Sequence, residues 1–235
     1  MINLMLPEII SENAQYWVIN KPAGMATEPP SRSLTLRDWL IEQGRIKPGE
    51  WDENDRAGIV HRLDTDTSGV IIWAKNHAAQ KHLRELWQGR AVRKNYLALV
   101  TGNAPDQGII EASLMRDNKK DRQVAALFPH PKARPAITEY ERLAVGEWEG
   151  NKVSLIRAHP ITGRTHQIRV HLKSIGHPII GDSLYGEKSG DAIAKGLHLN
   201  RQFLHAESIE LEGNSYSVEL PKELADCLKQ VNISL

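Results

Sequence analysis

One short segment places a carboxylate, an imidazole and a guanidinium among turn-forming residues, directly before an apolar run. The segment is His61-Arg62-Leu63-Asp64-Thr65-Asp66-Thr67-Ser68-Gly69, and the apolar run is Val70–Ala74. A continuous apolar run of this length is typical of a strand buried on both faces. The sequence therefore places Asp64 on a loop at the mouth of a rigid strand, where a carboxylate can be held for acid–base or nucleophilic chemistry.

Two less specific interpretations accompany this segment. Asp64 could cap the backbone of its own turn or pair with Arg62. Motifs for other chemistries are missing from the sequence, which contains no G-x-G-x-x-G, no G-x-x-x-x-G-K-[ST] and no H-E-x-x-H. Four histidines cluster in the second half of the chain without carboxylate or thiolate neighbours, namely His159, His166, His171 and His177. We therefore expect neither a cofactor nor a metal ion.

Further motifs follow the first in a recognisable order. Residues 20–25 read N-K-P-A-G-M, residues 94–96 read K-N-Y, and residues 162–171 read T-G-R-T-H-Q-I-R-V-H. H-P-I-I-G-D at 177–182 and L-H-A at 204–206 come next. With H-R-L-D-x-x-T-S-G at the start, this set resembles the RluA-type family of RNA pseudouridine synthases. The resemblance runs from about residue 16 to about residue 220.

The resemblance implies that uridine is isomerised to pseudouridine without an external reactant. It assigns the central role to Asp64, which either attacks C1′ covalently or abstracts the C2′ proton to give a glycal. It implies that Arg169 keeps Asp64 ionised and oriented, because a buried carboxylate needs a partner. Tyr96 would stack on the freed uracil and Ile168 would form an apolar wall. The alternatives are a surface arginine, a core tyrosine and a core isoleucine.

The resemblance also implies contacts to RNA. A base must leave its stack to react, and Arg62 matches the family arginine that enters the vacated space. His61 is expected to support the loop rather than to catalyse. Candidate phosphate contacts are Lys21, Arg164, Lys173 and the basic stretch 116–134. Arg164 and Thr165 are expected at a helix start, where free backbone N–H groups favour an anion.

Composition gives the class of protein. The 235 residues carry a net charge of +1 and one cysteine, Cys227, which excludes an internal disulfide and paired-thiolate zinc sites. No apolar run approaches the roughly 18–20 residues of a membrane span. The N-terminal residues lack a signal-peptide pattern, so we expect a cytoplasmic location. Basic stretches at 116–134 and 157–173 contrast with an acidic C-terminal segment, which favours a positive face for a polyanion or simply several solvated faces.

The elements that must position these residues alternate along the chain. Strands are predicted at 16–20, 70–74, 96–100, 137–143, 153–158, 203–211 and 216–220. Helices are predicted near 34–43, from Asn76 as N-cap through Gln88, and over 165–175. The last of these should bury Ile168 on one side and project Arg169 and Lys173 on another. This pattern predicts an α+β fold around a mixed, largely antiparallel sheet, and the resemblance adds a central catalytic cleft.

We expect residues 1–235 to form a single catalytic domain. Only some twenty residues precede Lys21, too few for the S4-type RNA-binding domain that many family members carry. The expected partner is structured RNA, ribosomal or transfer, bound by a monomer. One alternative function is a non-catalytic RNA-binding or RNA-folding protein on the same fold. Another is an aspartate-dependent hydrolase, for which Asp66 would have to supply the second carboxylate.

Overall fold

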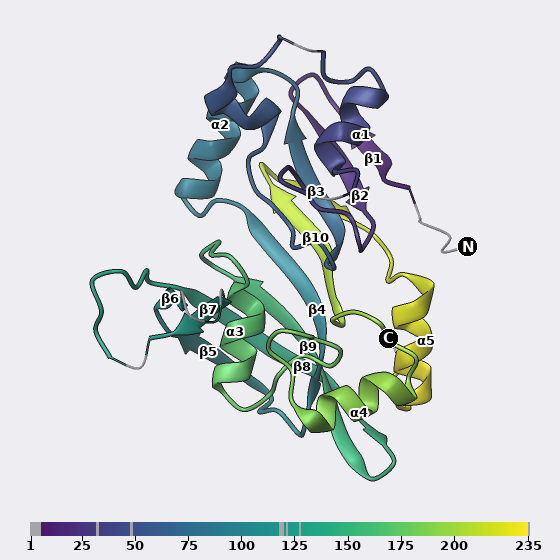
Figure 1. Cartoon of the computed structure of the whole chain (residues 1–235). Helices are drawn as coiled ribbons and strands as arrows, with labels where there is room; N and C mark the ends of the chain where they lie inside the picture. Colours follow the sequence, from purple (N-terminus) through teal and green to yellow (C-terminus); the bar gives the residue numbers. More distant parts are fainter. Residues whose placement is uncertain are drawn as a thin grey trace. The chain divides into compact units, whose positions relative to one another are not determined.

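The computed structural model describes residues 6–31, 33–47, 49–117, 120, 122–126 and 128–234. The chain forms two compact units. The first comprises Met1–Arg93 and Ala206–Glu219, and the second comprises Lys94–His205 and Leu220–Leu235. Each unit is held by its own strands and helices, labelled in Figure 1.

The first unit is built on strands in the order β1-β2-β3-β10, with β11 on β10. β1 and β2, β2 and β3, and β10 and β11 pair antiparallel. Their bounds are β1 Glu8–Glu12, β2 Tyr16–Lys21, β3 Ser68–Ala74, β10 Leu204–Leu211 and β11 Asn214–Ser217. Two α-helices and a short 3₁₀ segment complete the unit, namely α1 Leu36–Glu42, η1 Glu53–Gly58 and α2 His77–Gln88. The register pairs Lys21 with Gly69, which brings the end of β2 to the start of β3.

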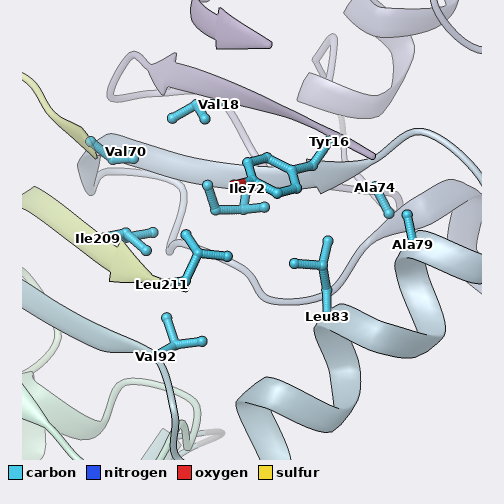
Figure 2. Packing of buried hydrophobic residues seen from close by; sticks show 10 residues of the cluster. All are labelled: Tyr16, Val18, Val70, Ile72, Ala74, Ala79, Leu83, Val92, Ile209 and Leu211. Atoms are coloured by element: carbon cyan, nitrogen blue, oxygen red, sulfur yellow. The ribbon is translucent and has the colours of Figure 1, made fainter. Parts of the chain in front are cut away.

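Helix α2 shows how local sequence and packing agree. The Asn76 side chain accepts the backbone N–H of Ala79, and Gly89 ends the helix. Ala79 and Leu83 are buried in one apolar cluster with residues of β2, β3 and β10, and Figure 2 shows them turned toward the strands. Every residue of β3 is buried, as its continuous apolar sequence predicts.

The second unit contains four antiparallel strands in the order β4-β9-β8-β5. Their bounds are β4 Arg93–Thr101, β5 Gln107–Glu111, β8 Ile137–Trp148 and β9 Asn151–Pro160. A separate hairpin pairs β6 Leu114–Asp117 with β7 Arg122–Ala125. The helices are α3 Gln167–Ser174, α4 Lys188–Gly196 and α5 Lys222–Gln230, and α3 packs against β7, β8 and β9.

The predicted α+β class with a largely antiparallel sheet is confirmed. The strands near 16–20, 70–74 and 96–100 and the helix ending at Gln88 lie where the sequence places them. The predicted helix start at Thr165 is wrong, because α3 begins at Gln167 after His166, which has a left-handed backbone with φ 55°. The single catalytic domain and its central cleft remain predictions. In the described part of the chain, no helix has the length and apolar character needed to cross a bilayer.

Candidate active site

Asp64 lies on the loop that enters β3, as predicted, and it is partly exposed. The Asp64 carbonyl accepts the backbone N–H of Thr67 at 3.1 Å, which closes a turn. The preceding Leu63 is buried, and it exchanges two hydrogen bonds with the Thr27 hydroxyl, at 2.9 Å through its carbonyl and 3.3 Å through its N–H. The backbone on both sides of the carboxylate is therefore fixed by tertiary contacts.

Gly69 is needed where this loop joins the strand. Its φ is +119°, and a Cβ there would lie 2.1 Å from the carbonyl oxygen of Ala206 on β10. Any other residue would both strain the backbone and separate the two strands. Gly69 thus has a structural role, because it allows the loop to join β3 next to β10.

Lys21 does not have the predicted position for a phosphate contact. Its side chain is fully buried, and its ammonium group donates to the carbonyl oxygens of Pro22 at 2.8 Å, Met25 at 2.7 Å and Thr65 at 3.1 Å. These bonds use the hydrogen-bonding capacity of the ammonium group inside the protein. The prediction is corrected: Lys21 ties the N-K-P-A-G-M segment to the loop that carries Asp64.

His61 supports the same loop, in line with its expected role. Its Nε2 atom accepts the backbone N–H of Ile72 at 2.9 Å, and its ring stacks on Trp87 with centroids 4.7 Å apart. Since a backbone N–H can only donate, Nε2 carries no proton in this arrangement. His61 is therefore held as a structural acceptor.

Arg62 presents a cation at the surface beside this loop. Its side chain is 57% exposed, and Nη1 lies 3.4 Å from Oε1 of Glu28. The Glu28 side chain is 12% exposed, so Arg62 is the solvent-facing member of this long ion pair.

The second unit carries the other predicted site residues. Tyr96 lies on β4 opposite Ala158 and is buried. Ile168 and Arg169 lie in the first turn of α3, and both are buried. The guanidinium of Arg169 has a buried carboxylate partner in the same unit.

That partner is Asp182, which the sequence places in the H-P-I-I-G-D motif without a role. Arg169 donates from Nε to Oδ2 at 2.7 Å and from Nη2 to Oδ1 at 2.8 Å. Oδ1 also accepts the backbone N–H groups of Leu184 at 3.0 Å and Tyr185 at 2.9 Å. Burial alone would raise the pKa of Asp182, but Arg169 and these N–H groups hold that pKa below its ordinary value.

The Tyr185 ring and the backbone before Asp182 also help to fix the position of Arg169. Its guanidinium lies 5.0 Å from the centroid of the Tyr185 ring, within cation–π range. The Tyr185 hydroxyl is itself placed by the backbone N–H of Gln123 at 3.0 Å and by Nδ1 of His166 at 2.9 Å. Gly181 precedes Asp182 with φ +77°, and a Cβ there would lie 2.2 Å from the Arg201 carbonyl oxygen. Arg169 is therefore held in one orientation.

The remaining basic candidates differ in accessibility. Arg164 is exposed, but it precedes α3 by three residues, and its N–H donates to Oε1 of Gln167 at 3.0 Å. The expected anion site at a helix start by Arg164 and Thr165 is therefore wrong. Lys173 is half-buried and donates to the carbonyl oxygen of Tyr185 at 2.9 Å. In the stretch 116–134, Lys119 lies outside the described residues.

The predicted residues thus fall into two sets. Asp64, Arg62 and His61 belong to the first unit, while Tyr96 and the α3 residues belong to the second. Within each unit the side chains are positioned by contacts that the sequence does not show. The pairing of Asp64 with the guanidinium of α3 stays a prediction.

Comparison with known proteins adds an independent observation. A family model described as RNA pseudouridylate synthase matches residues 15–174. An uncharacterized RNA pseudouridine synthase from Chloroflexus aurantiacus is 38% identical over 222 residues, covering 90% of this chain and 65% of that protein. Ribosomal large subunit pseudouridine synthase D from Zymomonas mobilis is 33% identical over 237 residues, covering 97% of this chain and 73% of that protein.

Solved structures agree with the sequence comparisons. Human RNA pseudouridylate synthase domain containing 1 is 28% identical with a TM-score of 0.72, covering 94% of this chain and 85% of that chain. Human RNA pseudouridylate synthase domain containing 4 has a TM-score of 0.77 at 24% identity, covering 97% and 94%, and shows a shared fold.

Proposed function

This chain belongs to the RNA pseudouridylate synthase family, and we propose on that basis that it isomerises uridine in RNA to pseudouridine with Asp64 as the catalytic carboxylate. The family match carries the proposal. The position of Asp64 supports it, because the carboxylate stands on a loop held by Lys21, Thr27 and the start of β3.

The proposed reaction rearranges one nucleoside without an external reactant. The N1–C1′ bond breaks, the uracil turns, and a C5–C1′ bond forms. C5 then loses its proton and N1 gains one, so atoms and electrons balance. A carboxylate can start this reaction in one of two ways, by attacking C1′ or by removing the C2′ proton. Asp64 is proposed as the carboxylate in either case.

Three residues of the second unit are proposed to assist. Arg169 would donate to Asp64, which keeps the carboxylate ionised. Tyr96 would stack on the uracil, and Ile168 would form the apolar wall. The fixed orientation of Arg169 supports this assignment, since a preorganised cation acts at no cost of rearrangement during the reaction.

The proposed partner is structured RNA. The Zymomonas relative is named for the large ribosomal subunit, which favours ribosomal RNA over transfer RNA as the target class. Arg62 is proposed to fill the space left by the extruded base, because it is exposed and weakly held. We also propose that the chain acts as a monomer in the cytoplasm and needs no metal ion.

The experiment measures tritium release from RNA labelled at uridine C5, together with mapping of new pseudouridines. Asp64→Asn should lower the release rate by at least about 100-fold while RNA binding changes little. Asp66→Asn, an exposed carboxylate two residues away on the same loop, is the matched control and should stay active. Turnover by Asp64→Asn at the wild-type rate would refute the assignment. Binding by the wild type without release would favour the non-catalytic alternative.

A further inference from the structure

The first unit contains a cavity that the proposed chemistry does not use. Its volume is about 600 Å³, within the range of ligand-binding pockets. The lining includes an aromatic ring, two guanidinium groups and two carboxylates, contributed by Glu28, Arg37, Trp51, Asp52, Arg56 and the neighbouring Ala57. This combination of a flat ring and paired cations is suited to a ligand that has both a planar group and an anionic group.

Trp51 supplies the flat surface. It is half-buried against the apolar cluster of the first unit, and its ring contacts the ring of His77, with centroids 4.6 Å apart. These contacts fix the indole ring while it lines the cavity. A fixed indole ring is a stacking platform for a nucleobase of any sequence.

Arg37 and Arg56 supply the positive charge. Nε of Arg56 donates to Oε2 of Glu28 at 2.7 Å, and its Nη2 bonds the other oxygen of the same carboxylate. Burial, followed by the positive charges of Arg62 and Arg84, lowers the pKa of Arg56. Nε of Arg37 is buried and meets no hydrogen-bond acceptor in the described part of the chain. A phosphate would relieve both the crowding of cations and the unmet donor.

The backbone beside these cations is strained. Arg56 and Ala57 both adopt left-handed conformations, with φ 51° and 53°. The carbonyl of Ala57 is held by the indole N–H of Trp73 at 2.7 Å, which fixes the unusual turn. Strain of this kind persists only where the surroundings enforce it, and it concentrates at ligand sites.

The cavity adjoins the loop that carries Asp64. Glu28 contacts Nη1 of Arg62 at 3.4 Å, and the adjacent Thr27 exchanges hydrogen bonds with Leu63. Arg62 and Leu63 directly precede Asp64 in the sequence. A strand of RNA that presents a uridine to Asp64 would therefore have its neighbouring nucleotides near this cavity.

We propose that this cavity binds one nucleotide of the RNA strand flanking the target uridine. The base stacks on Trp51, its edge N–H groups meet Asp52, and the phosphate binds Arg37 and Arg56, replacing Glu28 as the partner of Arg56. The inference rests on the proposed function, because it takes RNA as the substrate. It adds a second contact to the RNA strand, next to the target uridine.

The charge contacts are tested by the salt dependence of binding. The full-length protein is titrated with a fluorescein-labelled single-stranded RNA of roughly ten nucleotides at several salt concentrations. Arg37→Gln should reduce the slope of log affinity against log salt by about 0.7, the share of one phosphate contact on a single strand. Arg45→Gln is the matched control, since Arg45 pairs with Glu12 in the same unit and does not line the cavity.

The stacking contact has a different signature. Trp51→Leu should weaken binding about tenfold with the salt slope unchanged, because it removes a ring and no charge. Trp51→Phe keeps a ring and should retain most of the affinity. Glu28→Gln should tighten binding about threefold, because Arg56 and Arg62 no longer have a competing carboxylate. A gain of affinity cannot result from misfolding.

The outcomes separate the cavity from the catalytic proposal. The nucleotide site would be overturned if Arg37→Gln kept the wild-type salt slope and Trp51→Leu kept the wild-type affinity for RNA. This holds whatever the tritium assay shows. Absence of pseudouridine formation by the wild type on any RNA would instead overturn the proposed function. The site would be established if Arg37→Gln had a smaller salt slope, Trp51→Leu bound RNA more weakly and Glu28→Gln bound RNA more tightly.

Discussion

Replacing Asp182 by Asn should both destabilise the second unit and slow isomerisation. The substitution keeps the size of the side chain and removes its charge. Oδ1 accepts three hydrogen bonds and Oδ2 accepts one from Nε of Arg169. If the Asn oxygen keeps the three bonds of Oδ1, its NH₂ group faces the Nε–H of Arg169, donor against donor. Arg169 then remains buried without the negative charge that Asp182 supplies.

The expected loss follows from the burial of both groups. The side chains are 7% and 0% exposed, so solvent screens the pair little. Removing one partner of such a pair costs about 3–5 kcal/mol of unfolding free energy. Because Arg169 also loses its fixed orientation, the rate of tritium release should fall by about 100-fold, as expected when a catalytic contact shifts by an ångström.

The assay is urea denaturation of the full chain at pH 7 and at lower pH. Because the pKa of Asp182 is lowered in the folded state, its contribution is complete above the ordinary pKa and disappears as pH falls through the folded-state pKa. The difference between wild type and Asp182→Asn should therefore shrink in acid. Asp106→Asn is the control, since Asp106 pairs with Arg142 but is 83% exposed, and it should cost less than about 1 kcal/mol.

A double variant tests whether the loss belongs to the pair. Arg169→Met combined with Asp182→Asn removes both charges, so its cost should be smaller than the sum of the two single costs. Strict additivity, or an Asp182→Asn protein as stable as the wild type at pH 7, would refute the reasoning. Stability lost without any change in turnover would separate the ion pair from catalysis.

Three further predictions concern other residues. Arg62→Ala should slow isomerisation more for a paired than for an unpaired target uridine, and equal slowing in the tritium assay would remove its gap-filling role. Lys21→Met should lower the unfolding free energy in urea by about 3 kcal/mol or more, because it leaves three carbonyl oxygens without their donor. Burial lowers the pKa of Lys94 from its ordinary value of 10.5 to about 8 in the folded protein. The buried charge therefore destabilises the fold below about pH 8. This cost disappears above about pH 10.5, where the amine is neutral in both the folded and the unfolded protein. Wild-type stability should therefore rise by about 3 kcal/mol relative to Lys94→Met between about pH 8 and pH 10.5, and parallel pH curves would contradict this.

Much of the fold could be predicted because its signals are local. Asn76 and Gly89 mark the ends of α2, and the apolar run before Lys75 marks β3, through capping and burial rules that act over a few residues. The family resemblance also depends on residues close together in the chain, and the comparisons confirm it. Asp64 could be singled out for the same reason, since its loop and its strand are adjacent.

The sequence alone therefore determined the α+β class, the family and several of the elements, and it singled out Asp64 as the candidate carboxylate. It did not predict β1, β5, the β6–β7 hairpin, α4 or α5. Tertiary structure decided which charges are buried and what they contact. Lys21 becomes structural only because folding brings Thr65, 44 residues away, to its ammonium group. Asp182 becomes the partner of Arg169 only when folding brings it, 13 residues further along the chain, to the guanidinium group. The physical reason is that the energy of a charge depends on desolvation and on partners distant in sequence, which local patterns do not record.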